Sequence, residues 1–373
     1  MKHLFSFIKK EPVLFCSAIL AIISSCVVLP DSQYIHYIDY RVLALLFCLM
    51  IVVAGFESIH VFVVLGNRLL TGVHSTRGIL LILISLSFFS SMLITNDVAL
   101  ITFIPFSISL LYMVDAKHLL IPFLVLQTIA ANMGSMLTPI GNPQNLYLYS
   151  EYNISIGSFM IAMLPLAAIS YALLCLCAFF LPSQSTTRTP DKSHTLQTVP
   201  LLFYLALLVV CLLCVARLLP FEIMLVIVLI SVLIYKRSLF LKADYKLLAT
   251  FFCFFIFIGN VERIPAISVL LLQLIRSREY YISLILSQFI SNMPAAMLTS
   301  GFTDQGFAIL YGVDIGGLGT LIASLASVIT YGFYSKCEGA KKGQYLKAFT
   351  LYSLLFLCVL VPCGYLLLRF CVY

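Results

Sequence analysis

Two short polar clusters interrupt long apolar runs of this chain. Thr95-Asn96-Asp97 lies within the run 78–113, and Ser291-Asn292-Met293-Pro294 lies within the run 280–311. Hydroxyl and amide groups can donate hydrogen bonds to carboxylate or oxyanion oxygens without carrying a fixed charge, and amide oxygens can bind a hard cation such as sodium. Both clusters are therefore candidate ligands for a small ion.

A second polar segment, 138–146, follows the first cluster. It contains Pro139 and Pro143, which have no N–H, so the carbonyls of Ser135 and Pro139 lose their helical partners and become available as sodium ligands. Gly141 lets the backbone bend or approach an ion closely. The start of a half-helix beyond such a break presents unpaired N–H groups and a positive dipole end, which suit an anion.

The same pair of segments occurs again in the second half of the chain. Asn96 falls on Asn292 at an offset of 196 residues, and 138–146 falls on 320–328 at an offset of 182 residues. The second offset also aligns polar and small residues just before the break: Asn132 with Asp314, and Gly134 with Gly316. Broken segments in matching positions of two halves are typical of a transporter site near the middle of the membrane.

These segments define the predicted site. The predicted substrate-binding residues are its hydroxyl and amide side chains, namely Thr95, Asn96, Asn142, Asn145, Ser291, Asn292, Thr320 and Ser324. The predicted coupling-ion residues supply carboxylate, amide or freed carbonyl oxygens or shape the break, namely Asn96, Asp97, Ser135, Pro139, Gly141 and Asp314. Ser, Thr, Asn and Gly also join transmembrane helices by packing, so it is their paired arrangement that favours a site.

Carboxylates at membrane depth are candidates for coupling, because each has to be neutralised by a cation or a proton. Asp97 is the strongest candidate, since it adjoins the interruption of its run. Glu57 lies in the middle of its predicted span and is a further candidate, as is Asp314. Glu262 has an ordinary explanation in its neighbour Arg263.

The composition shows what surrounds these residues. Of the 373 residues, 62% are hydrophobic and only 10% are charged, so the solvent of this chain must be lipid. We predict an all-α polytopic membrane protein in which both interrupted runs are re-entrant hairpins. Its nine crossing helices are expected at about 13–30, 42–65, 119–150, 155–181, 199–217, 219–235, 247–275, 312–334 and 348–371.

Basic residues indicate the orientation. With the N-terminus in the cytoplasm, most of the 22 Lys and Arg residues fall on the cytoplasmic side, as the positive-inside rule requires. The net charge of +7 is thus a topology signal and needs no nucleic-acid partner. We predict a multi-pass inner-membrane protein. The twelve cysteines are scattered through apolar runs without a zinc-like arrangement, so no metal centre is expected.

The order of these segments predicts two inverted repeats. Each repeat has four crossings, an even number, so two repeats directly in tandem would have the same orientation. The additional helix between them inverts the second repeat. The predicted divisions are an N-terminal repeat at 1–181 with its hairpin at 78–113 and broken helix at 119–150, a cytoplasmic linker at 182–198, a connecting helix at 199–217, and a C-terminal repeat at 219–373 with its hairpin at 280–311 and broken helix at 312–334.

At these motifs the sequence resembles the ion transporter superfamily, which includes citrate-transporter-like permeases, divalent anion:sodium symporters and arsenite-pump membrane subunits. The resemblance covers nearly the whole chain and looks closest to a little-characterised bacterial permease branch. It rests on Thr95-Asn96-Asp97-Val98-Ala99-Leu100, Thr138-Pro139-Ile140-Gly141-Asn142-Pro143-Gln144-Asn145 and Ser291-Asn292-Met293-Pro294. The resemblance implies a homodimer in which a scaffold domain holds the interface and an elevator-like domain carries the substrate.

The two serine-asparagine-threonine signatures of the dicarboxylate symporters fall on 95–97 and 291–293. Both asparagines are kept, but the third position is Asp97 in one signature and Met293 in the other. The added negative charge of Asp97 disfavours a dianion and favours cation coupling, proton coupling or a monovalent or neutral substrate. The second broken helix has Ser324 and Ser327 in place of proline and asparagine, which predicts a weaker or absent second cation site.

We therefore expect a secondary active transporter for a small anion or oxyanion, coupled to sodium or protons and needing no cofactor beyond a coupling ion. An arsenite or antimonite efflux permease and a sodium/proton antiporter are alternatives on the same scaffold. The chain contains neither a G-x-x-x-x-G-K-[ST] loop nor an H-E-x-x-H motif. An enzyme is therefore not expected, and an ATP-driven pump would need a separate ATPase subunit.

Overall fold

The computed structural model describes residues 12–185 and 197–372, and in this part of the chain the regular structure is helical, with a single isolated bridge between Ser75 and Ser185. The first half contains α2 (Pro12–Val27), η1 (Ser32–Tyr37), α3 (Tyr40–Ser58), α4 (Val61–Leu70), α5 (Thr76–Ile94), α6 (Asn96–Met113), η2 (Lys117–Leu119), α7 (Leu120–Ser135), α8 (Pro143–Glu151) and α9 (Ile156–Phe180). The second half contains α10 (Thr198–Val215), α11 (Phe221–Lys236), η3 (Arg237–Lys242), α12 (Tyr245–Glu262), α13 (Pro265–Ile275), α14 (Glu279–Ile290), α15 (Asn292–Ser300), α16 (Gly306–Gly316), α17 (Leu325–Tyr334), α18 (Lys342–Leu367) and the π-helical turn η4 (Leu368–Val372).

Among the described residues, nine helices are long and apolar enough to cross a membrane. This confirms the prediction of an all-α polytopic membrane protein. However, these nine helices are not the same nine segments that we predicted to cross the membrane. By length and composition alone, α5 and α6 each qualify, although we expected them to be the arms of one re-entrant hairpin, whereas α2, α16 and α17 are shorter.

Two predicted spans are wrong as single helices. The run 42–65 divides into α3 and α4 at His60, which takes a left-handed conformation with φ 56°. The run 247–275 divides into α12 and α13 after Arg263, and Pro265 opens the second helix, where its missing N–H is harmless. Glu57, expected in the middle of a span, instead lies one residue before the end of α3.

One predicted boundary also differs. The second hairpin ends at Ser300, where α15 stops, and α16 begins at Gly306, so residues 306–311 belong to the broken helix and not to the hairpin. The linker expected at 182–198 falls largely on residues outside the described part.

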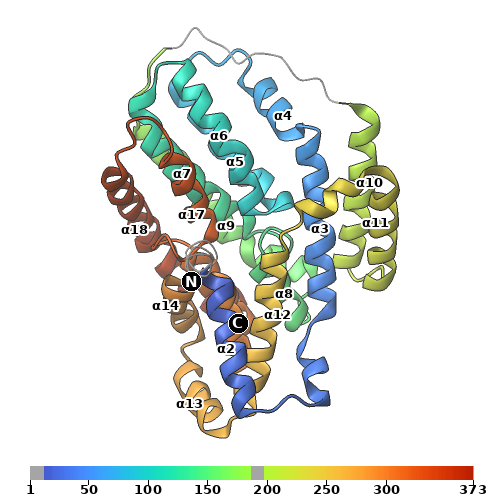
Figure 1. Cartoon of the computed structure of the whole chain (residues 1–373). Helices are drawn as coiled ribbons and strands as arrows, with labels where there is room; N and C mark the ends of the chain where they lie inside the picture. Colours follow the sequence, from blue (N-terminus) through green and yellow to red (C-terminus); the bar gives the residue numbers. More distant parts are fainter. Residues whose placement is uncertain (1–11, 186–196, 373) are drawn as a thin grey trace, which may run out of the picture.

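The two hairpins turn in the same way. α5 meets α6 at Thr95, with φ 68° and ψ 152°, and α14 meets α15 at Ser291, with φ 73° and ψ 156°. This backbone region is occupied almost only by glycine and costs about 1–3 kcal/mol for other residues. Figure 1 shows α5 and α6 in the upper part of the molecule and α13 and α14 in the lower part.

The two broken helices lie against these hairpins. α7 packs on α5 and continues after the break as α8, and α16 packs on α14 and continues as α17. Pro143 is the first residue of α8, where a fixed φ suits a helix start. A Cβ added at Gly141 would lie 2.0 Å from the carbonyl oxygen of Ser135, so the first break requires glycine at this position.

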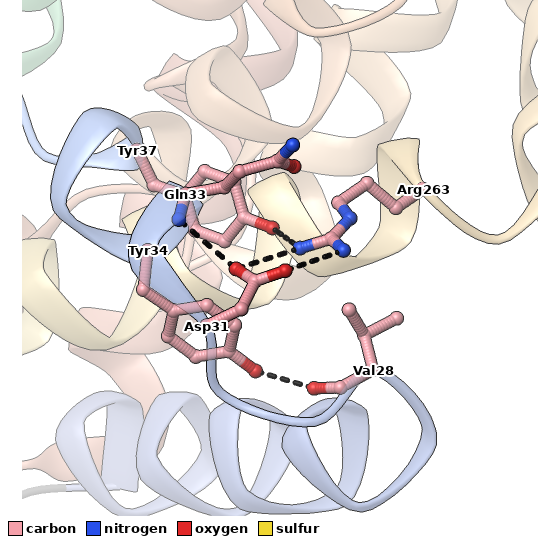
Figure 2. A network of polar contacts seen from close by, with 6 residues as sticks. All are labelled: Val28, Asp31, Gln33, Tyr34, Tyr37 and Arg263. Carbon is pink, nitrogen blue, oxygen red and sulfur yellow. Dashed lines mark hydrogen bonds and ion pairs between the residues drawn. The ribbon is translucent and has the colours of Figure 1, made fainter.

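An exposed polar network joins the N-terminal helix to α12. The Arg263 guanidinium donates to Oδ1 and Oδ2 of Asp31 at 3.1 and 2.8 Å and to the Tyr37 hydroxyl at 2.8 Å, as Figure 2 shows. Tyr34 donates to the carbonyl of Val28 in the same network. The ion pair of Arg263 is therefore with Asp31 and not with its neighbour Glu262, because Arg263 caps the end of α12 and reaches the loop before η1.

This network makes a pH-dependent contribution to stability. The hydrogen bonds from Arg263 hold the pKa of the Asp31 carboxyl below its usual value. Its stabilising effect is therefore fully present above the ordinary carboxyl pKa and is lost as the pH falls through the lowered value. We expect Asp31→Asn to lower the melting temperature slightly at pH 7, because exposed ion pairs contribute little, and to have no effect at a pH below the lowered pKa.

The measurement is thermal unfolding of the purified protein in detergent across this pH range. Asp304→Asn, at an exposed aspartate between α15 and α16, is the matched control. A loss of stability in Asp31→Asn that is independent of pH would contradict the assignment.

Candidate functional site

Each hairpin tip is hydrogen-bonded to the break of its broken helix. The backbone N–H of Asn96 donates to the carbonyl of Gly141 at 3.3 Å, and that of Asn292 donates to the carbonyl of Ala323 at 3.0 Å. Asn96 aligns with Asn292 at the offset of 196 residues, and Gly141 aligns with Ala323 at the offset of 182 residues. The same backbone interaction thus occurs in both halves.

Further contacts repeat in the same way. The Oδ1 of Asn96 accepts from the N–H of Asp97 at 2.8 Å, and the Oδ1 of Asn292 accepts from the N–H of Met293 at 3.0 Å. Each break is also anchored to its hairpin by a threonine hydroxyl: Thr138 donates to the carbonyl of Met92, and Thr320 donates to the carbonyl of Gln288. Residues paired by the sequence alignment therefore make equivalent contacts.

The two halves contact each other at the breaks. Ser324 Oγ donates to Asn132 Oδ1 at 2.9 Å, and Gln144 Nε2 donates to Asp314 Oδ1 at 3.1 Å. The side chain of Asn142 also lies beside Asp314. Because Asn132 aligns with Asp314, and Asn142 with Ser324, the pair Asn142–Asp314 corresponds to the pair Ser324–Asn132 of the other half. Asn132 and Asp314 are only 4% and 3% exposed, so the contacts are buried in the protein interior.

The Asn145 amide lies between Asp314 and the break. In one orientation its Nδ2 is 3.4 Å from the carbonyl oxygens of Ser135 and Thr138. Turned over, Nδ2 donates to both carboxylate oxygens of Asp314 at 2.9 and 3.0 Å. The second orientation is favoured because its hydrogen bonds are shorter and charge-assisted.

In this orientation the Asn145 Oδ1 faces the two carbonyl oxygens. Three oxygens, from Ser135, Thr138 and Asn145, then lie close together, and the Thr138 carbonyl also accepts from the Gly141 N–H at 3.3 Å. Carbonyl and amide oxygens are the ligands that hard cations prefer. Two further acceptors, Asp97 Oδ1 and Asn142 Oδ1, are buried without a hydrogen-bond partner among the described residues. The first break is therefore rich in oxygens that a cation could satisfy.

Most of the predicted site residues lie around the two breaks. Seven are linked by the contacts above, namely Asn96, Ser135, Gly141, Asn142, Asn145, Asp314 and Ser324. Ser291 and Asn292 bind the second break through Ala323, and Pro139 is buried in the first. Thr320 is exposed and anchors a loop, and Thr95 forms the strained turn without capping its helix.

The sequence alone did not identify Asn132 and Gln144 as site residues, although both are buried and join the halves. Asn132 receives hydrogen bonds from Asn96 Nδ2 at 2.8 Å and from Ser324. The sequence feature that could have identified Asn132 is its alignment with Asp314, because it places Asn132 in the same position of the first repeat that a candidate coupling residue has in the second.

Comparison with known proteins agrees with this architecture. The family model described as "Citrate transporter" matches residues 4–305, a range that includes both hairpins and the first broken helix. An uncharacterised transporter, MJ0456, from Methanocaldococcus jannaschii is 33% identical over 310 residues, which cover 81% of this chain and 83% of that protein.

Two further relatives are membrane or transport proteins. The inner membrane protein YbiR of Escherichia coli is 29% identical over 306 residues, 78% of this chain and 79% of its own length. The rice silicon efflux transporter LSI3 is 32% identical over 171 residues, 44% of this chain and 34% of its own length. These matches confirm the resemblance and indicate a transporter rather than an enzyme. The chain is a multi-pass membrane transporter that belongs to the citrate transporter family.

Proposed function

We propose that this chain is a secondary active transporter that couples the movement of a cation to that of a small anion or oxyanion. The observation that carries the proposal is the group of oxygens from Ser135, Thr138 and Asn145 beside the buried Asp314. A cation among these oxygens would satisfy them and balance the carboxylate charge. The anion would be bound by neutral donors of the hairpin tips and breaks.

Sodium is the favoured coupling ion. A proton needs one acceptor, whereas this break supplies several oxygens, two of them from main-chain carbonyls, which bind metal ions but do not titrate. The cation would also couple the two halves, since Asp314 on α16 holds the Asn145 amide of α8 in the orientation that offers its oxygen. Asp97, at the first turn of α6, is a second carboxylate group, and it belongs to the first half of the chain.

We extend the proposal to the setting of the transporter. It acts in the inner membrane as a homodimer, with a cytoplasmic N-terminus, and carries its substrate by an elevator-like movement of hairpins and broken helices. The family membership supports these features, and the basic residues of the loops support the orientation.

An uncharged oxyacid such as arsenous acid is the second candidate substrate. The rice relative named as a silicon efflux transporter favours it, as do the neutral side chains of the second break. Uptake into proteoliposomes, screening anions and oxyacids under imposed sodium and proton gradients, separates the candidates. A sodium gradient should drive anion uptake. Transport that responds to neither gradient would contradict cation coupling.

Asn145 should control the sodium dependence. Asn145→Ala removes one of the three oxygens, so we expect the half-saturating sodium concentration to rise about tenfold, equivalent to about 1.4 kcal/mol, with transport retained at high sodium. Ser150→Ala, on the same helix but bonded to Asp39, is the control and should match the wild type. An unchanged sodium dependence in Asn145→Ala would place the cation elsewhere.

A further inference from the structure

The two helix breaks carry different charges although their contacts correspond. At the first break, amide side chains at the start of α8 surround the Asp314 carboxylate. Gln144 donates at 3.1 Å and Asn145 at 2.9 and 3.0 Å, and Asn142 adds a third amide. A carboxylate that only accepts hydrogen bonds is matched to donors of this kind. The N-terminal end of α8 is thus already occupied by a negative group from the chain itself.

At the second break the corresponding residues are neutral. Ser324 takes the place of Asn142, Ser327 that of Asn145, and Asn132 that of Asp314. Ser324 donates to Asn132 Oδ1 at 2.9 Å, the counterpart of the contact to Asp314. No side chain supplies a negative charge in this set, so the N-terminal end of α17 has its donors but no internal anion.

Two donors at this second break have no partner among the described residues. Asn132 Nδ2 and Ser327 Oγ are buried, in residues that are 4% and 0% exposed, and neither has a hydrogen bond. Ser327 lies in the first turn of α17, and Asn132 is held there through Ser324. Burying unpaired donors costs free energy, which an anion at the positive end of the helix would recover.

We propose that the start of α17, with Asn132 and Ser327, is the anion half-site, and that Asp314 is a built-in anion that fills the equivalent half-site at α8. This inference rests on the proposed function and deepens it. The first break binds the coupling cation, whose charge Asp314 balances, and the second break binds the anionic group of the substrate. The substrate therefore presents a single anionic group, as in a small monocarboxylate or a monovalent oxyanion.

The built-in anion also acts against larger substrates. A dianion that reached both breaks would place its second charged group beside Asp314, which already occupies the amide donors and balances the coupling cation, so this group would be buried without a partner. Asp314 is thus a specificity-determining residue that excludes dicarboxylates. Replacing Asp314 with a neutral residue should allow the first half-site to bind an anionic group. A carboxylate in place of Asn132 should prevent the second half-site from binding one.

The test measures binding of acetate, formate and succinate to the purified full-length protein in sodium-containing buffer, by calorimetry and by thermal shift. Wild type should bind a monoanion and discriminate against succinate at least tenfold. Asp314→Asn should reduce or reverse that preference. Asn132→Asp copies an arrangement that the other half already accommodates, so it should fold and lose monoanion binding at least tenfold.

Ser327→Ala tests the half-site with a variant that should fold normally. Its hydroxyl is unpaired in the ligand-free protein, so the melting temperature without anion should stay the same or rise, while monoanion affinity falls severalfold. Ser335→Ala, at the opposite end of α17, is the control and should bind as the wild type. Wild-type affinity in folded Asn132→Asp and Ser327→Ala would overturn the half-site.

Failure of the proposed function gives a different result. If the wild type binds none of these anions and transports no anion under a sodium gradient, the proposed function fails, and this inference fails with it. If the wild type binds a monoanion with a sodium dependence that Asn145→Ala weakens, but Asn132→Asp, Ser327→Ala and Asp314→Asn leave anion preference unchanged, only the half-site assignment is overturned.

Discussion

Gly134→Ala should prevent α7 from packing against α5 and should sharply reduce the amount of folded protein in the membrane. A Cβ at this position would lie 2.0 Å from the carbonyl oxygen and 2.6 Å from the carbonyl carbon of Phe88. Both atoms belong to the backbone of α5, so the helices themselves must move apart. We expect a cost at the upper end of the range for overpacking, about 3 kcal/mol or more.

Two other glycines make a graded control series. At Gly316, the counterpart of Gly134, a Cβ would lie 2.8 Å from Ser287 Cβ and 3.0 Å from the Leu284 carbonyl, so Gly316→Ala should destabilise less. At Gly332 in α17 nothing lies within 4 Å, and alanine should be neutral or stabilise by up to about 1 kcal/mol.

The measurement is the monodisperse fraction after detergent extraction, together with the melting temperature. The expected order of damage is Gly134→Ala, then Gly316→Ala, then Gly332→Ala. A Gly134→Ala protein as stable as the wild type would show that α5 and α7 do not approach so closely.

The interruptions of the apolar runs were the most predictable part of the structure. Pro139 and Pro143 have no N–H to donate within a helix, and the polar groups of 95–97 and of Ser291 and Asn292 are costly to expose to lipid. The sequence alone therefore located both tips and the first break. The alignment also paired residues that prove to make equivalent contacts, such as Thr138 and Thr320.

Other features could not be predicted because they depend on long-range contacts. Arg263 pairs with Asp31, 232 residues away in the chain, although a carboxylate stands next to it. The division between α3 and α4 falls at His60 within an apolar run, where no proline or glycine marks it. Asn132 and Gln144 join opposite halves, and aligning the halves shows which residues correspond but not which ones touch.

Each of the two breaks is bound by a helix of the opposite half. Asp314 on α16 is bound by α8, and Asn132 on α7 is bound by Ser324 at the start of α17. Each half thus completes the polar environment of the other. A shift of one broken helix relative to the other would change both breaks at once, and this would connect the proposed cation site to the proposed anion half-site.

The tip asparagines should be the most sensitive side chains for transport. Asn96→Ala and Asn292→Ala each remove an amide at a hairpin tip and leave the lipid-facing surface unchanged. Hydrogen bonds to charged groups contribute about 1.5–3 kcal/mol, so we expect roughly a tenfold to hundredfold loss in transport efficiency for each variant. Membrane expression should remain near that of the wild type.

The two variants should differ in stability. Asn96 Nδ2 donates to Asn132 at 2.8 Å, so Asn96→Ala also weakens the contact between the halves. Among the described residues, the Asn292 amide oxygen accepts from neighbours at its own tip, the N–H of Met293 at 3.0 Å and the Ser291 hydroxyl at 3.3 Å. Asn292→Ala should therefore lose transport with a nearly unchanged melting temperature, which separates a ligand role from a packing role.

Asn260→Ala provides the matched control. Asn260 is a buried asparagine on α12 that donates to the hydroxyls of Ser24 and Ser25 at 3.1 and 3.3 Å, away from both tips. Its replacement should lower stability but leave transport per folded molecule intact. The measurement is uptake into proteoliposomes normalised to folded protein, alongside thermal unfolding. If Asn96→Ala and Asn292→Ala transport as well per molecule as Asn260→Ala, the polar tips are packing features and the site must lie elsewhere.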